Sequence, residues 1–344
     1  MHPERPQGRA ASSPPPVGVE ETWSGPAFPG EALPPFVQAC GQGVYAVDTG
    51  FHRDRFDAAY LLVHGGRAAF IDTGTNFAVP RLLQALEAVG LGPGSVDWVI
   101  PTHVHLDHAG GVGLLMQSLP RARVLVHPRG ARHLVDPSAL FQGALAVFGQ
   151  AEMDRSYGTP VGVPADRVQT SDDGMVIELG GRPLRLIDTP GHARHHHAVW
   201  DELTRGWFTG DTFGLSYRDF DSAAGAWLLP TTTPVQFEPD AMQRSIERMM
   251  ATDPQCVYLT HFGRIDGVPA RAAQLLALLR QLVDTARALK DAPDRHHALQ
   301  RAQLELYTDS LRAHGCTLPV ETIAQLLAID LELNAQGLAV WLDR

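Results

Sequence analysis

The sequence predicts an α+β protein in which two β-sheets pack face to face and helices cover the outer surface of each sheet. Short apolar runs typical of strands occur in two groups, within residues 43–127 and within residues 175–259, and segments with helical spacing stand between and after them. The chain has 344 residues, of which 44% are hydrophobic, so it can bury a large core as one big domain or two. We find no internal sequence repeat.

The first group opens with three strands and a helix. The predicted strands are residues 43–47, 59–63 and 67–71. His64-Gly65-Gly66 supplies a tight hairpin turn between the last two strands. Residues 77–89 then place their leucines on one helical face, and Gly90 ends this helix.

A strand and a helix flank a polar, histidine-rich segment in the middle of this half. Residues 97–100 form a buried strand, residues 110–119 have the pattern of a helix, and Asp107 is placed to cap that helix. A further strand is predicted at residues 123–127, followed by a short helix at residues 138–148.

The second group of strands leads into a helical C-terminal region. The predicted strands are residues 175–179, 183–187, 198–200, 206–209 and 256–259. A helix begins at Pro239, between the last two of these strands. Pro269 opens a long amphipathic helix, and two more helices are expected at residues 294–313 and 319–336, the last ending near Gly337.

These patterns divide the chain into three parts. Residues 1–35 are rich in Pro and Gly and lack apolar periodicity, so we expect a flexible arm; an arm that covers a neighbouring subunit is the alternative. Residues 36–268 form the main domain, and residues 269–344 form the C-terminal helical region.

Composition excludes several classes of partner. The net charge of −10 gives no electrostatic attraction to nucleic acid or to an anionic membrane, and no apolar run reaches the length of a membrane span. No secretory leader is visible at the N-terminus. The three cysteines, Cys40, Cys256 and Cys316, are far apart in the sequence, so we expect no disulfide framework and a cytoplasmic location.

Metal-binding residue types are concentrated in residues 102–111. Four potential ligands fall within six residues: His103, His105, Asp107 and His108. His103 and His105 are two residues apart, so in an extended or loop backbone their side chains point the same way. The following Asp-His pair can face a second point nearby. The segment therefore predicts a metal site at a strand-to-helix junction, where α/β proteins place their chemistry.

The segment His103-Val104-His105-Leu106-Asp107-His108 resembles the HxHxDH signature of the metallo-β-lactamase superfamily. The remaining superfamily motifs are found in chain order at residues 71–74, 189–192, 210–212 and 260–263. The resemblance covers roughly residues 36–268. It implies a four-layer αββα sandwich, here with a C-terminal helical extension, and it is much more specific for the superfamily than for any substrate.

The resemblance implies two divalent metal ions per chain. It assigns one ion to His103, His105 and His192, the other to Asp107, His108 and His261, and makes Asp211 the bridge between them. Imidazole and carboxylate suit zinc, with iron or manganese as alternatives, and two ions about 3.5–4 Å apart need a shared anionic ligand. Asp72 is expected to orient a ligand rather than to bind metal.

Some of these assignments have competitors. His192 competes with the histidines at residues 195–197, and we choose it because it follows a Thr-Pro-Gly turn at a strand end. His196 is then a residue that supports the ligands or packs in the core. Asp211 could otherwise be a turn aspartate, and His261 a histidine that merely ends a strand.

The implied chemistry is hydrolysis of an ester-like bond, such as a thioester or a lactone, by a metal-bridging hydroxide. Asp107 would accept a proton from the nucleophile and pass it to the leaving group. Asp211 argues against a β-lactamase of the commonest type, because the resemblance implies a cysteine at this place in those exported enzymes. Aromatic residues after Asp211 predict an apolar substrate pocket, formed by Tyr217, Phe220 and Trp227.

Other activities of this fold remain as alternatives. Glyoxalase II-like members are the nearest general resemblance, but they hold glutathione with basic residues in C-terminal helices, and this C-terminal region is near neutral. A persulfide dioxygenase-like protein would bind one iron with His103, His192 and Asp211, and the second set of ligands disfavours it. A phosphodiesterase is a further alternative, but the net charge of −10 disfavours long nucleic acids and leaves small phosphodiesters as its substrates. A non-catalytic metal-binding or interaction protein is disfavoured by the intact ligand set.

The expected partner is a small-molecule substrate, and a homodimer is possible. The apolar faces of the C-terminal helices must be covered, either by packing over the metal site as a roof or by a second subunit. The long helix starts soon after His261, and we expect the roof.

Overall fold

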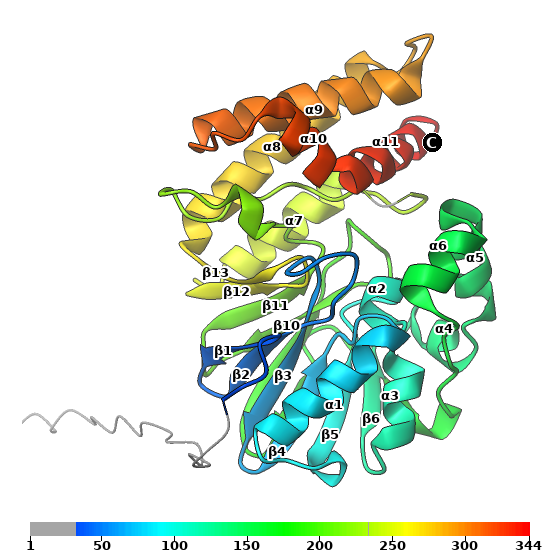
Figure 1. The fold of residues 1–344 in the computed structure, drawn as a ribbon, viewed down its shortest axis with the longest axis vertical. Coiled ribbons are helices and arrows are strands. Elements are labelled where there is room, and N and C mark those ends of the chain that lie inside the picture. The colour runs from blue at the N-terminus through cyan, green and yellow to red at the C-terminus, as the bar shows by residue number, and fades with distance from the viewer. Residues whose placement is uncertain (1–31, 233) are drawn as a thin grey trace, which may run out of the picture.

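The computed structural model describes residues 32–232 and 234–344, and it contains two β-sheets that pack face to face with helices outside (Figure 1). The predicted fold class, an α+β sandwich with added C-terminal helices, is confirmed. The arm expected at residues 1–35 falls almost entirely outside the described residues.

The first sheet has seven strands in sequential order. They are β1 (Val37–Gly41), β2 (Val44–Asp48), β3 (Ala58–His64), β4 (Arg67–Ile71), β5 (Val96–Ile100), β6 (Arg123–Val126) and β7 (Val168–Thr170). The first four strands pair antiparallel, and the last four pair parallel. The parallel strands β4 and β5 therefore deliver their carboxyl ends to one edge of the sheet.

The second sheet has six strands in the order β13-β12-β11-β10-β9-β8. Their bounds are β8 (Val176–Leu179), β9 (Arg182–Asp188), β10 (His197–Asp201), β11 (Gly206–Gly210), β12 (Cys256–Leu259) and β13 (Gly263–Asp266). Only β11 and β12 pair parallel.

Helices cover both outer faces and extend the molecule at one end (Figure 1). Those that follow strands of the first sheet are α1 (Val79–Ala88), α2 (Leu106–Ala109), α3 (Val112–Ser118), α4 (Ala131–Val135), α5 (Ser138–Phe148) and α6 (Gln150–Glu152). Those of the second half are α7 (Pro239–Met250), α8 (Val268–Ala288), α9 (Arg295–Ala313), α10 (Val320–Leu326) and α11 (Ala328–Leu342). None of these helices, within the part of the chain that the structure describes, is long and apolar enough to span a membrane.

Apolar side chains from both sheets meet in the centre. Tyr60 and Ile100 of the first sheet and Val199 and Phe208 of the second are at most 1% exposed and belong to one cluster. Strands that are buried on both faces read as continuous apolar runs, which is why the central strands were predictable from sequence.

The polar motif differs from the prediction in one respect. A single helix was expected at residues 110–119 with Asp107 as its cap, but α2 already begins at Leu106, and His105 is its N-cap residue. Asp107 lies in the first turn of α2, so its side chain is free to face the neighbouring ligands. The helix N-terminus also favours a carboxylate there.

The C-terminal region also differs from the prediction. One helix was expected at residues 319–336 with a stop near Gly337, but the chain forms α10 and α11, and Gly337 lies inside α11. A Cβ atom at this position would lie 2.2 Å from the carbonyl oxygen of Thr232. The glycine therefore permits close packing of α11 on the loop before α7, instead of ending the helix.

Candidate metal centre

The predicted ligands gather at one end of the sandwich, where several strands finish. His103 and His105 follow β5, and His192 follows β9. Asp211 comes directly after β11, and His261 follows β12. These segments are far apart in the sequence. The sheets bring them together because β5, β9, β11 and β12 end at the same edge.

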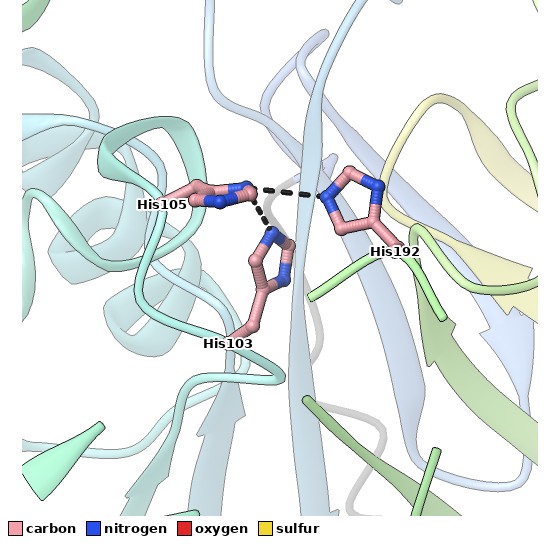
Figure 2. Close-up of side chains that lie close together, drawn as sticks. All are labelled: His103, His105 and His192. Carbon is pink, nitrogen blue, oxygen red and sulfur yellow. Dashed lines mark hydrogen bonds between the residues drawn. The ribbon is translucent and has the colours of Figure 1, made fainter. Parts of the chain in front are cut away.

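Three histidines form the first cluster of candidate ligands (Figure 2). Nε2 of His103 lies 2.8 Å from Nδ1 of His105, and Nε2 of His192 lies 3.2 Å from the same Nδ1 atom. Three ring nitrogens that point at one another are suited to share a cation, because each neutral imidazole offers a lone pair on that nitrogen.

A second cluster lies on the other side of His103. It consists of Asp107, His108 and His261, whose ligand atoms lie within 4.8 Å of one another. One carboxylate oxygen of Asp107, Oδ2, is 3.7 Å from Nε2 of His108 and 3.5 Å from Nε2 of His261. Six of the candidate ligands thus lie in two groups of three, and a third group of His103, His108 and Asp211 overlaps both.

The carboxylate of Asp211 lies between the two clusters. Its Oδ1 atom is 3.3 Å from Nε2 of His108, and its Oδ2 atom is 3.4 Å from Nε2 of His192. The two oxygens of one side chain therefore face different clusters. This is the placement that a shared anionic ligand requires.

The chemistry of the donor set fits a cation. Burial disfavours a charged imidazole at His108, but the carboxylates of Asp211, Asp107 and Asp72 outweigh it and raise the pKa of His108 well above its usual value. Nε2 of His108 and Oδ1 of Asp211 are both buried and have no hydrogen-bond partner among the described residues. Buried polar atoms without partners are uncommon, and metal coordination would satisfy both of these.

Asp72 orients His108 rather than joining the ligand clusters. Its carboxylate accepts hydrogen bonds from the backbone N–H of Thr102 at 2.7 Å, from Nδ1 of His108 at 3.0 Å and from the hydroxyl of Thr260 at 2.8 Å. The proton on Nδ1 leaves the lone pair of His108 on Nε2, facing the site.

The hydroxyl of Thr231 orients His192 in the same way. It donates to the carbonyl oxygen of Asp211 at 3.0 Å, so it must accept from Nδ1 of His192, which lies 2.8 Å away. The proton is therefore on Nδ1, and Nε2 keeps its lone pair for the site. His261 follows the same rule, since its Nδ1 donates to the carbonyl oxygen of Phe56 at 3.0 Å.

His196 supports the backbone at Asp211. Its Nε2 accepts the backbone N–H of Asp211 at 3.3 Å, and its Nδ1 donates to the hydroxyl of Thr189 at 2.7 Å. A Cβ atom on Gly210 would lie 2.4 Å from this Nε2. The close approach of His196 therefore requires a glycine before Asp211. His196 acts on the site by holding the backbone of Asp211 in place.

The three residues predicted to line a substrate pocket are all buried, with at most 1% exposure. Tyr217 stacks on Phe56, with ring centroids 5.0 Å apart, and Phe56 meets the ring of His261 edge-on at 5.5 Å. Phe220 and Trp227 pack edge-to-face at 5.6 Å, in the same apolar cluster as Tyr217 and residues of the C-terminal helices, and within the described residues neither ring contacts a candidate ligand. We therefore assign Phe220 and Trp227 to the core, and Tyr217 to the residues behind His261.

Sequence reasoning missed the hydroxyl groups around the ligands. Thr102 and Thr260 both contact Asp72, and each directly precedes a ligand histidine, so a repeated Thr-His pair was a usable signal. No comparable signal marks Thr231, because the loop at residues 230–238 meets His192 only in the folded chain.

Comparison with known proteins identifies a matching family and similar chains. The sequence model described as the metallo-beta-lactamase superfamily matches residues 52–261, which is more than half of the chain. The metallo-beta-lactamase fold-containing protein ST1585 of Sulfurisphaera tokodaii is 31% identical over 177 residues, which are 49% of this chain and 62% of the relative. The crystal structure of ST1585 from Sulfolobus tokodaii superimposes with a TM-score of 0.61 at 22% identity, covering 87% of this chain and 98% of that one, which shows a shared fold.

Two enzymes are among the similar sequences. Hydroxyacylglutathione hydrolase of Acidiphilium cryptum is 28% identical over 201 residues, which are 58% of this chain and 62% of the enzyme. Acyl-coenzyme A thioesterase MBLAC2 of Homo sapiens is 27% identical over 192 residues, which are 51% of this chain and 64% of the enzyme. The chain thus matches less than two thirds of the length of these curated relatives. With the family match, the αββα fold and the His/Asp clusters together, the chain belongs to the metallo-β-lactamase superfamily.

Proposed function

We propose that the chain is a binuclear metal-dependent hydrolase that acts on small thioesters. The observation that carries the proposal is the carboxylate of Asp211, which directs one oxygen to each cluster of ligands. Thioesters are favoured among ester-like bonds because a hydroxyacylglutathione hydrolase and an acyl-coenzyme A thioesterase are both among the similar sequences.

Seven side chains would hold the two ions. One ion would lie among His103, His105 and His192, the other among Asp107, His108 and His261, with Asp211 shared. Zinc suits this set of imidazole and carboxylate donors, with iron and manganese as alternatives. When bound, the ions supply an activated water at neutral pH and polarise the carbonyl group of the substrate.

Asp107 is the side chain best placed to move a proton. Its side chain is 24% exposed, whereas those of His108 and His261 are at most 5% exposed. Burial alone would raise the pKa of Asp107, but His108 and His261 hold it well below its usual value. An ionised, partly exposed carboxylate can accept a proton from the attacking water and return it to the departing thiolate, so that acid and thiol are the products.

The proposal is tested by metal analysis together with a substrate panel. We expect two metal equivalents per chain and faster release of thiol from acyl thioesters than hydrolysis of lactones or phosphodiesters. His108→Ala and His261→Ala should each lower the metal content towards one equivalent and reduce kcat, because both act in the second cluster.

Several results would overturn the proposal. One metal equivalent, together with full activity of both histidine variants, would exclude a binuclear enzyme. Oxygen uptake with a persulfide substrate and one bound iron would identify an oxygenase, and a preference for phosphodiesters would identify a phosphodiesterase.

We place the activity in the cytoplasm on the ground that Cys40, Cys256 and Cys316 are buried and unpaired, as suits a reducing compartment.

A further inference from the structure

A cationic cavity lies between the N-terminus of α7, the C-terminal half of α8 and the end of α11. It has a volume of about 570 Å³. Four of its ten lining residues carry a positive charge: Arg244, Arg287, Lys290 and Arg344. In the whole chain only 28 of 344 residues are Lys or Arg, and the net charge is −10. The cavity is therefore a local excess of positive charge on an acidic protein, and it includes the only lysine in the sequence.

The acidic residues of the cavity only partly neutralise these cations. Glu238 is already paired with Arg194, whose Nη2 atom lies 2.5 Å from its carboxylate, and this leaves Asp240. Within residues 32–232 and 234–344, Arg244 and Lys290 take part in no ion pair. Unpaired cations that converge on a concave surface favour a ligand with several negative charges.

The cavity continues along the helices and is partly fixed in shape. A second cavity of about 210 Å³ shares Pro239, Asp240 and Arg287 with the first and adds Arg280 and Asp284. Asp284 pairs with Arg287, whose Nη1 atom lies 3.5 Å from its Oδ1 atom, whereas Arg280 takes part in no ion pair within the described residues. The guanidinium carbon of Arg287 lies 5.5 Å from the ring centroid of Trp341, a cation–π contact that limits the positions of this side chain. An elongated anion with more than one charged group suits such a groove better than a single small ion.

The cavity adjoins the segment that carries a metal ligand. The backbone N–H of Glu238, which lines the cavity, donates to the carbonyl oxygen of Gly191 at 2.8 Å. Gly191 directly precedes His192 in the chain. A ligand held by the cations would therefore lie beside the loop of His192, and a flexible arm could continue from it towards the metal centre.

We propose that this cavity binds the phosphate groups of a phosphorylated thioester substrate, whose reacting bond lies at the metal centre. The proposal rests on the proposed thioesterase function and names the substrate class of that site. Arg244, Arg287 and Lys290 bind phosphate through charge-assisted hydrogen bonds. The carrier of the acyl group is thus a thiol with phosphate groups at its far end, such as coenzyme A, rather than a thiol that carries only carboxylates.

The first test measures binding without catalysis. ADP, as the phosphorylated probe, is titrated into the full-length protein by calorimetry, with adenosine and inorganic phosphate in parallel. We expect saturable binding of ADP to the wild-type protein. The dissociation constant should be at least about tenfold higher for adenosine with the wild-type protein, and for ADP with the double variant Arg244→Ala/Arg287→Ala. Arg248→Ala is the matched control, because Arg248 lies on α7 and pairs with Asp173 instead of lining the cavity.

The second test compares two thioesters of the same acyl group, one with coenzyme A and one with N-acetylcysteamine, which has no phosphate. The double variant should raise KM for the coenzyme A thioester at least about tenfold, with kcat and the N-acetylcysteamine thioester nearly unchanged. Absence of ADP binding, or an equal effect on both thioesters, would overturn the proposal. If neither thioester is hydrolysed by the wild-type enzyme, the proposed function fails, and the ADP titration still decides whether the cavity binds phosphate.

Discussion

Removal of one hydroxyl group, by Thr231→Val, should weaken metal binding at the cluster of His103, His105 and His192 and leave the other cluster intact. The hydroxyl of Thr231 donates to the carbonyl oxygen of Asp211 at 3.0 Å and accepts from Nδ1 of His192 at 2.8 Å. Valine has nearly the same shape, so the substitution removes both hydrogen bonds with little change in packing.

The magnitude follows from these two contacts. Thr231 is 5% exposed and His192 is 5% exposed, so water is poorly placed to replace the lost hydroxyl. Loss of a partner that orients a metal-binding histidine costs about 10–100-fold in metal affinity, or about 1.4–2.7 kcal/mol. Without the acceptor at Nδ1, the proton of His192 can move to Nε2, the nitrogen that faces the other ligands, and this tautomer cannot bind a metal there.

Competition with a chelator of known affinity measures the two metal equivalents separately. We expect one equivalent to weaken about 10–100-fold and the other to stay within about twofold of wild type. Thr252→Val is the matched control, because the hydroxyl of Thr252 also donates to a carbonyl oxygen, that of Met249 at 2.8 Å, and accepts a ring N–H, that of Trp207 at 2.9 Å, away from any ligand. Equal weakening in both variants would refute the role assigned to Thr231.

Two further substitutions test the surroundings of the second cluster. Asp72→Asn should weaken the metal equivalent held by His108 about 10–100-fold, because an amide has one acceptor oxygen, whereas Oδ1 of Asp72 accepts from the backbone N–H of Thr102 and Oδ2 accepts from Nδ1 of His108; unchanged affinity in the chelator assay would contradict this. Burial raises the pKa of Asp330 to about 7, so its folded-state pKa lies above the unfolded value of 3.8. The folded protein then binds this proton more tightly than the unfolded chain does. The contribution of protonated Asp330 to the free energy of unfolding is therefore present below about pH 4 and is lost as the pH rises through about 7. Asp330→Asn cannot titrate, so urea unfolding of the metal-free proteins should show the variant gaining up to about 3 kcal/mol relative to wild type between pH 4.5 and pH 8, while a constant difference would exclude the titration of Asp330.

The candidate ligands could be assigned from the sequence because the superfamily motifs occur in order, not because periodicity alone placed them. Four candidate ligands fall in one short segment, and the resemblance assigned the other three to residues that follow predicted strands. The short edge strands β1, β7 and β13 were not predicted. β7 has three residues, and β13 has the sequence Gly-Arg-Ile-Asp, so neither gives an apolar run.

The role of the aromatic segment after Asp211 could not be read from composition. An aromatic side chain looks the same in a sequence whether it faces a substrate or a buried helix. Both rings are buried against the C-terminal helices. The indole N–H of Trp227 donates to the hydroxyl of Ser310 on α9, at 2.9 Å, and the hydroxyl of Tyr217 donates to Asp330 on α11, at 3.0 Å. Both partners lie more than 80 residues away in the sequence, beyond the reach of local patterns.

The same helix, α11, also contacts the loop of Thr231, beside the first cluster of ligands. This contact changes what we expect when the C-terminal helices are removed. The side-chain amide of Asn334 accepts the backbone N–H of Thr232 at 2.7 Å and donates to the carbonyl oxygen of Pro230 at 3.2 Å, so it fixes the loop that carries Thr231. From sequence, deletion of residues 292–344 was expected to impair turnover while metal binding persisted.

These contacts of α11 predict that its loss also weakens metal binding through His192. Asn334→Leu tests this in the full chain, since it leaves a backbone N–H and a carbonyl group buried without partners, at about 1–3 kcal/mol each. We expect lower stability together with a selective loss of affinity at the cluster of His192, measured by chelator competition. Gln336→Leu is the control on the same helix, because the side chain of Gln336 hydrogen-bonds to Glu332, at 2.7 Å, and to no other side chain or backbone group within the described residues. If Asn334→Leu lowers stability but both metal equivalents bind as in wild type, α11 supports the fold and does not position the ligand, because a misplaced Thr231 could not leave the tautomer of His192 unchanged.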